Sequence, residues 1–357
     1  MPPFLQFVIR RFLVIPVSLL IITMILYGGV MLTPPEARAT LYYPPKMNPN
    51  MTEEQMLHFQ EMIIKRYHLR DPFIVQYGYW VGSLLDGSWG YSPTMNQDVL
   101  PALLQQTPIT VELALYSLLF LIPLGLVSGV MSGWRRSSVF DRLFRGTAFL
   151  STSTPSFILA LVLLSVFYVQ LDWFAPGRIS FRYSMEISEE TFTKLTGMLT
   201  IDSLLNGRLD IFWDACKHLA MPVFTLSLYH WATLGRIART SMIDERGKEY
   251  IVSARARGLP ERRVVWRHAF QNMLSPALTS IALSATSIIT GVFVVEIIFN
   301  FNGVSRVILS AMSGVPDAPA ALGFAVYSVL MVLILMFVLD ILQAILDPRI
   351  REGMLTS

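Results

Sequence analysis

Long stretches of mostly apolar residues recur along the chain, each close to the length of about 20 residues that a helix needs to cross a bilayer. A hydropathy window places them at 10–32, 110–133, 146–171, 218–236, 276–299 and 321–345. Charged residues make up only 15% of the chain, whereas soluble domains carry about 25%. We therefore predict an all-α, polytopic membrane protein with six transmembrane helices.

The first span has features of a signal peptide, and the fourth is less apolar than the others. Residues 10–32 follow Arg10 and Arg11, and Ala37-Arg38-Ala39 imitates the cleavage site of a signal peptide. The apolar run exceeds the about 7–15 residues of a signal peptide and further spans follow, so we favour a retained helix. The fourth span is the weakest, because His230, Trp231 and several hydroxyl residues dilute it.

Lysine and arginine set the predicted orientation. They concentrate in the N-terminus, in 134–145, in 237–275 and in the C-terminus, as the positive-inside rule requires of cytoplasmic segments. The residues concerned are Arg10, Arg11, Arg135, Arg136, Arg142, Arg145, Arg239, Arg246, Lys248, Arg255, Arg257, Arg262, Arg263, Arg267, Arg349 and Arg351. We expect both termini to be cytoplasmic.

Several classes of site are missing from the sequence. There is no G-x-x-x-x-G-K-[ST], so the chain has no loop of its own for ATP phosphates. The single Cys216 and five scattered histidines show no metal-ligand spacing, and no basic patch is interleaved with aromatics for nucleic acid. We expect no enzyme, no metal and no cofactor in this chain.

Residues 33–109 form a long segment expected outside the membrane. Apolar residues recur at helical spacing from Glu53 to Arg70, and we expect a helix that starts after Thr52. Phe73–Leu85 is apolar and aromatic but too short to span a bilayer, and Asp86-Gly87 then signals a turn. The segment is either a belt lying on the outer membrane surface or a platform for a periplasmic partner.

Residues 237–275 form the most informative of the polar loops. Asp244 and Glu245 are expected to begin a helix that Gly258 ends, and Pro260 to start the next one. The helix is slim, with Ser253, Ala254 and Ala256 on its surface beside Tyr250 and Arg257. Two interpretations stay open: a helix that docks in a partner's groove, or an amphipathic elbow on lipid headgroups.

The fifth span is rich in hydroxyl groups and ends near a carboxylate. Ser284, Thr286, Ser287 and Thr290 either line a pore or bond to their own helix backbone. Glu296 is a candidate functional residue because it is ionisable at membrane depth, although it could instead reach the interface or pair with an arginine.

Backbone-shaping residues also mark the spans. Gly125, Gly129 and Gly133 are four apart, which predicts close helix packing. Prolines favour kinks and lie in or at the ends of spans at Pro123, Pro155, Pro222 and Pro276.

Several segments together resemble a known family. Residues 249–258 (E-Y-I-V-S-A-R-A-R-G) are similar to the E-Y-x-x-T-A-R-A-K-G segment of binding-protein-dependent ABC importer permeases of the dipeptide/oligopeptide/nickel type. Further matches are the R-Y-x-L-x-D-P-x-x-x-Q-Y-x-x-W pattern at 66–80, G-S-W-G-Y-S at 87–92, T-P-I-T-V-E-L at 107–113, P-G-R at 176–178, the R-H-A run at 267–276, V-E-I-I-F at 295–299 and D-P-R-I-R at 347–351. The chain departs from the pattern at Tyr67-His68, Ser88-Trp89, Asn302, Ser305 and Gln343.

The resemblance implies a type I ABC importer permease bundle in a bacterial inner membrane. It divides the chain into 1–9 (cytoplasmic), 10–32 (first span), 33–109 (periplasmic insertion), 110–351 (five-helix core with a coupling helix at 244–258) and 352–357 (tail). It implies coupling to an ATPase through Glu249, Tyr250, Ser253, Ala254, Arg255, Ala256, Arg257 and Gly258.

The resemblance also implies partners. These are a homologous second permease, two ATPases that bind ATP and magnesium, a periplasmic or lipid-anchored binding protein, and membrane lipid. The substrate is expected to be a di- or oligopeptide. Nickel, glutathione or another small solute remains an alternative, as does a stand-alone secondary transporter or channel.

Overall fold

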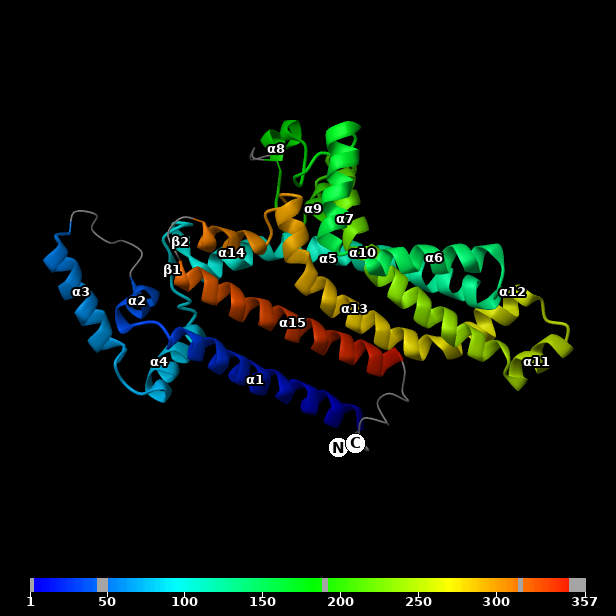
Figure 1. Cartoon of the computed structure of the whole chain (residues 1–357), viewed down its shortest axis with the longest axis horizontal. Coiled ribbons are helices and arrows are strands. Elements are labelled where there is room, and N and C mark those ends of the chain that lie inside the picture. Colours follow the sequence, from blue (N-terminus) through cyan, green and yellow to red (C-terminus); the bar gives the residue numbers. More distant parts are fainter. Residues whose placement is uncertain (1–2, 44–50, 188–191, 314–316, 347–357) are drawn as a thin grey trace. The chain divides into compact units, whose positions relative to one another are not determined.

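The computed structural model describes residues 3–43, 51–187, 192–313 and 317–346. These residues are almost entirely helical, with one two-stranded antiparallel hairpin in which Tyr91 pairs with Asp98. They form two compact units (Figure 1). Unit 1 is built around Ile109–Asn302, and unit 2 around Val8–Pro108 with Gly303–Ile334. The expected all-α class is confirmed. The motif at 347–351 and the tail at 352–357 lie outside the described residues.

Three helices have residues in both units: α1 (Pro3–Val30), α5 (Val99–Trp134) and α15 (Ala318–Leu346). Unit 2 also holds α2 (Pro35–Ala39), the 3-10 turn η1 (Thr40–Tyr42), α3 (Glu53–Arg66), α4 (Phe73–Leu85), β1 (Tyr91–Ser92), β2 (Gln97–Asp98) and α14 (Ser305–Met312). Unit 1 also holds α6 (Val139–Ser153), α7 (Ser156–Leu163), the π-helix η2 (Leu164–Gln170), α8 (Phe181–Ile187), α9 (Leu199–Leu205), α10 (Leu209–Arg246), α11 (Glu249–Ala256), α12 (Glu261–Arg263), the π-helix η3 (Val264–Ala269) and α13 (Phe270–Ile298).

Four helices of the described residues are long and apolar enough to cross a membrane: α1, α5, the run from α12 to α13, and α15. A fifth candidate is the pair formed by α6 with α7 and η2. The predicted fourth span lies within α10, a continuous helix of 38 residues that does not reach the same apolar standard. Its polar residues, already visible in the sequence, are the reason, and the count of six spans stays a prediction.

Two predicted spans differ from the helices observed. The third, 146–171, is not one straight helix, because the chain bends by 100° between α6 and α7. The break falls at Pro155, whose ring and missing N–H oppose helix continuation, and Figure 1 shows α7 turning away from α6. The second begins at Val99 rather than 110, so the 107–113 motif is helical and not part of a loop.

Local signals in unit 2 predict helix ends well. Thr52 and Gln55 form a capping box, with Thr52 Oγ1 accepting from the Gln55 N–H at 3.4 Å and Gln55 Oε1 from the Thr52 N–H at 3.1 Å. Helix α3 therefore starts at Glu53 as expected but ends at Arg66, four residues before the predicted Arg70. The apolar segment Phe73–Leu85, for which no secondary structure was predicted, forms α4, and the predicted turn follows at Gly87 with φ +80°.

The glycine stripe of α5 packs closely against α10 in unit 1. A Cβ built on Gly133 would lie 2.5 Å from the Arg239 carbonyl oxygen, and one on Gly129 would lie 2.7 Å from the Ala238 Cβ. The prediction that these glycines serve helix packing is confirmed, because only a hydrogen side chain permits this approach.

This packing yields a stability prediction. Gly129→Ala should lower the melting temperature of the purified chain in detergent, because the new methyl group overlaps α10. Gly146→Ala is the matched control: Gly146 is also helical but has open space around its Cβ position, so the substitution should be neutral or stabilise by up to about 1 kcal/mol. Equal melting shifts for the two variants would contradict the packing role.

Candidate functional site

The segment 249–258 folds as a short helix with sharp ends. Gly247 closes α10, Lys248 precedes α11 with extended backbone, and Glu249 supplies an acidic first turn. Gly258 ends the helix with φ +74°, a conformation that favours glycine. Asp244 and Glu245 do not begin this helix, contrary to expectation. They belong to the last turn of α10, because that helix continues unbroken to Arg246.

The two faces of α11 differ in exposure. Ile251 and Ala254 are buried at 0% and 2% exposure. The outward residues are Glu249, Val252, Ser253, Ala256, Arg257 and Gly258, with Arg255 and Tyr250 partly covered. Ala254 therefore packs within the chain, which corrects its placement on the slim outer surface. Val252, at 58% exposed, is an apolar residue of the outer face that the sequence analysis omitted.

Contacts at both ends fix α11 to unit 1. Glu245 accepts a hydrogen bond from the Tyr250 hydroxyl. It also forms an ion pair with Lys248, whose Nζ lies 2.7 Å from Glu245 Oε1. Burial, with the Glu245 hydrogen bond in support, raises the pKa of Tyr250 to about 12, so its hydroxyl stays a donor at neutral pH. Arg255 pairs with Glu261 at 2.8 Å and lies over the Trp134 ring at 5.0 Å. Tyr250 and Arg255 thus anchor the helix.

A buried carboxylate also links α6 to α5 and α10. Asp141 of α6 is 1% exposed and accepts from Arg239 Nε at 2.6 Å and Nη2 at 3.0 Å. It also accepts from Ser132 Oγ at 2.6 Å and the Ser137 N–H at 3.0 Å. This cluster was not predicted from the sequence. The available signal was the S-x-x-D pattern at Ser138, whose hydroxyl caps α6.

The candidate pore residues divide into separate environments. Ser284 is buried, and Thr286 and Thr290 donate to their own helix carbonyls at Ala282 (3.0 Å) and Ser287 (2.9 Å). Ser287 and Thr290 nevertheless line a cavity of about 450 Å³ in unit 1. Other polar lining residues are Thr152, Ser153, Thr154, Ser156, Tyr229 and His230, contributed by the α6–α7 break and by α10.

Two glutamates of unit 1 are buried away from this cavity's lining. Glu296 is 0% exposed and accepts a hydrogen bond from Thr110 Oγ1. Glu112 accepts from Arg178 Nη2 at 2.7 Å and from the Thr200 N–H and hydroxyl, both at 2.7 Å. The motifs at 107–113 and 176–178, which are separate in the sequence, therefore meet in one ion pair.

Comparison with known proteins agrees with this architecture. Residues 121–352 match the family described as binding-protein-dependent transport system inner membrane component. The chain belongs to this family. The permease is 31% identical to the di/tripeptide transport system permease protein DppB of Pseudomonas aeruginosa, over 98% of this chain and 99% of the relative. It is 32% identical to the oligopeptide transport system permease protein AppB of Bacillus subtilis, over 82% and 85%.

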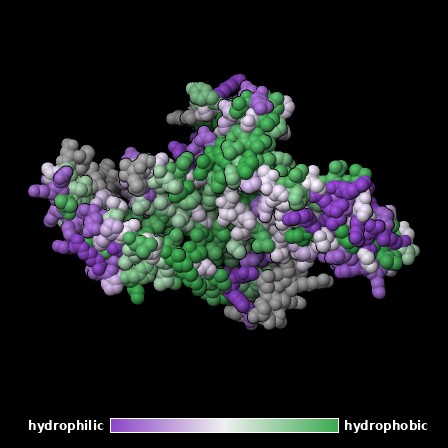
Figure 2. Space-filling model, in the orientation of Figure 1, coloured by the Kyte–Doolittle hydropathy of each residue, from purple (hydrophilic) through white to green (hydrophobic). Residues whose placement is uncertain are grey.

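Hydrophilic and hydrophobic side chains are separated on the surface of unit 1. Figure 2 shows hydrophilic side chains gathered at the end of unit 1 that carries α11 and α12, and hydrophobic ones over α7. The permease is a multi-pass membrane protein, and an ABC importer permease works with other subunits of its complex. The exposed face of α11 lies on this polar end (Figure 2).

Proposed function

We propose that this permease is a membrane subunit of an ATP-driven peptide importer and that α11 is its contact with an ATPase. One observation carries the proposal: a helix that exposes the small side chains of Val252, Ser253 and Ala256 on its outer face, while its inner face is buried and its ends are tied to neighbouring helices. A slim helix face suits insertion into a groove. The tied ends let movement of α11 pass to α10.

The proposal assigns roles to the rest of the chain. The cavity near Ser287 contributes to the solute pathway, because the hydroxyl groups in its largely apolar lining offer hydrogen bonds without fixed charge. A second permease completes that pathway, and a binding protein delivers the solute. The ATPases bind ATP and magnesium, and this chain binds neither. The segment 237–275 and both termini are cytoplasmic, on the evidence of lysine and arginine placement.

The substrate assignment rests on the relatives' names. DppB of Pseudomonas aeruginosa is named for di- and tripeptides, and AppB of Bacillus subtilis for oligopeptides. Uptake of a labelled dipeptide into proteoliposomes of the complete complex tests it. Competition by unlabelled peptides is expected, and competition by nickel or glutathione alone would replace the peptide assignment.

A co-purification experiment tests the coupling role. We expect the tagged chain, isolated from native membranes in mild detergent, to bring down a second permease and an ATPase. Gly258→Val should keep the chain in the membrane but cut ATP-driven transport at least about tenfold, since valine at positive φ costs roughly 1–3 kcal/mol and shifts the end of α11.

The control for this variant is Gly247→Ala. Gly247 lies in the turn at the other end of α11, with φ −87° and open space around its Cβ position, so alanine should leave transport near wild type. Normal transport by Gly258→Val would refute the assigned role of this helix end. Recovery of the chain alone would favour a stand-alone transporter.

A further inference from the structure

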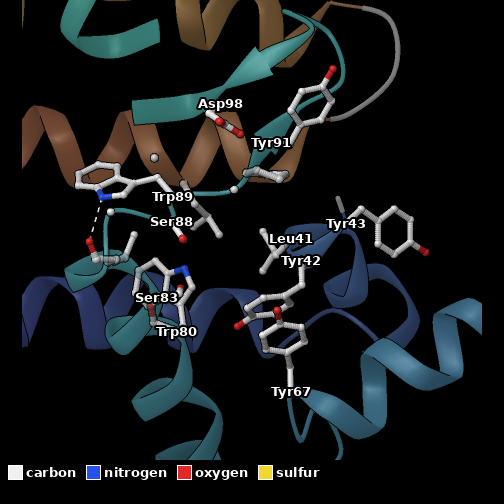
Figure 3. Close-up of a pocket in the computed structure, with 16 residues that line it drawn as sticks. Leu41, Tyr42, Tyr43, Tyr67, Trp80, Ser83, Ser88, Trp89, Tyr91 and Asp98 are labelled. Carbon is white, nitrogen blue, oxygen red and sulfur yellow. Dashed lines mark hydrogen bonds between the residues drawn. The ribbon is translucent and has the colours of Figure 1, made fainter. Parts of the chain in front are cut away.

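A cavity of about 340 Å³ opens in unit 2, and none of its lining residues belongs to α11 or to the cavity near Ser287. Figure 3 shows it between the hairpin of β1 and β2 above and α4 with η1 below. Aromatic side chains dominate its walls: Tyr42, Tyr67, Trp80, Trp89 and Tyr91. A concave site that combines this much aromatic surface with a few serine hydroxyls and one carboxylate can hold a small organic molecule.

The aromatic walls are held in place by specific contacts. Tyr42 and Tyr67 stack with ring centroids 4.0 Å apart and planes 16° from parallel. Trp89 donates from Nε1 to the Leu84 carbonyl at 3.1 Å and packs edge-on to Tyr327. Trp80 is 5% exposed and stacks on Tyr27 at 5.0 Å. The walls are therefore formed before any ligand arrives, which lowers the entropic cost of binding.

Asp98 is the only charged residue that lines the cavity among those described. It lies at the rim on β2, opposite Tyr91 in the hairpin register. The carboxylate is solvent-exposed and forms no salt bridge with any part of the chain that the structure describes. It therefore adds one uncompensated negative charge to an aromatic pocket.

The hairpin that carries Asp98 is locked within unit 2. The buried Asp317 accepts hydrogen bonds from Ser92 Oγ at 2.5 Å and from Thr94 Oγ1 at 2.8 Å, and caps α15 through the Ala320 N–H at 3.0 Å. Gly90 has φ +88°, and a Cβ there would lie 2.9 Å from Pro319. The carboxylate is thus presented by a fixed backbone.

We propose that this cavity binds a small organic cation bearing an ammonium group. Tyrosine and tryptophan rings attract cations through their quadrupoles, and a nearby carboxylate adds Coulomb attraction. Two basic groups lie close to the wall, and neither lines the cavity. The Arg66 guanidinium lies 5.8 Å from the centroid of the Tyr67 ring. The Arg38 guanidinium is held by Gln76 Oε1 at 2.6 Å and the Leu69 carbonyl at 3.0 Å. The site would give this permease a ligand separate from the transported solute.

The test compares a cation with its uncharged isostere. Tritiated choline is applied to the purified full chain in a maltoside detergent, which has no choline headgroup, and 3,3-dimethylbutan-1-ol serves as the neutral competitor of the same shape. We expect saturable choline binding, with the neutral alcohol at least about tenfold weaker because it lacks the cation–π and Coulomb contributions.

Two carboxylate variants locate the site. Asp98→Asn should weaken choline binding about five- to tenfold, whereas Asp86→Asn, an equally exposed carboxylate of unit 2 outside the cavity lining, should not change it. Melting temperatures of both variants check that the fold is intact. The proposal fails if choline does not bind saturably, if the neutral alcohol competes equally well, or if Asp98→Asn binds choline as the wild type does.

Discussion

Ala256→Trp is expected to leave the chain folded and membrane-inserted while reducing ATP-driven transport at least about tenfold, because the indole would fill the groove that is proposed to receive α11. Ala256 is exposed on the outer face of the helix beside Val252 and Ser253. A larger side chain at this position extends from an exposed site and not into the core of unit 1. The loss should therefore come from docking and not from stability.

Two comparison variants isolate the docking effect. Ala256→Ser keeps the side chain small and should transport like the wild type. Ala254→Trp places the same indole on the buried face, where Ala254 is 2% exposed, so it should lower the amount of folded protein through overpacking. Solute uptake, ATP hydrolysis and membrane abundance are measured together. Wild-type uptake by Ala256→Trp would show that this face does not contact an ATPase.

Glu112→Ala should be among the most destabilising single substitutions in this chain, at about 3–5 kcal/mol. It would remove the carboxylate partner of Arg178, which is 23% exposed and keeps only the Gly197 carbonyl at 2.7 Å, and would leave the buried Thr200 N–H and hydroxyl without an acceptor. The expected observation is a large fall in melting temperature in detergent. The melting temperature of Glu112→Gln should lie between those of the wild type and Glu112→Ala, because glutamine keeps an acceptor oxygen but not the charge.

An exposed ion pair provides the control for Glu112. Glu61 lies 2.8 Å from Arg70 Nη2, with side chains 45% and 55% exposed. Solvent screens such a pair, so Glu61→Ala should cost less than about 1 kcal/mol. If Glu112→Ala melts no lower than Glu61→Ala, the buried cluster does not hold α5 to the segment around Arg178.

The sequence predicted those features that depend on neighbouring residues. The start of α3 after Thr52, the turn at Gly87 and the end of α11 at Gly258 follow from local backbone preferences. The packing role of Gly129 was also predictable, because small residues four apart lie on one helix face. The break at Pro155 was expected as a kink, but its 100° angle was not.

The candidate site was predicted less completely. Residues 249–258 were identified through a family resemblance, but that resemblance does not say which face of the helix is covered. Ala254 was therefore placed outside and Val252 was overlooked. The predicted start of the coupling helix at Asp244 was also wrong, because α10 continues to Arg246. An acidic residue is favourable in the first turn of a helix, but it can also form an ion pair near the end of another helix, as Glu245 does with Lys248.

The sequence by itself determined the membrane class and the helical content of this protein, because apolar composition over about 20 residues is a local property that the bilayer selects. The tertiary structure alone decided the partners of the buried carboxylates. Glu112 meets Arg178 across 66 positions and Asp317 meets Ser92 across 225. Such pairs form because a buried charge must find compensation wherever the fold brings donors together, and that location is fixed by packing over the whole chain.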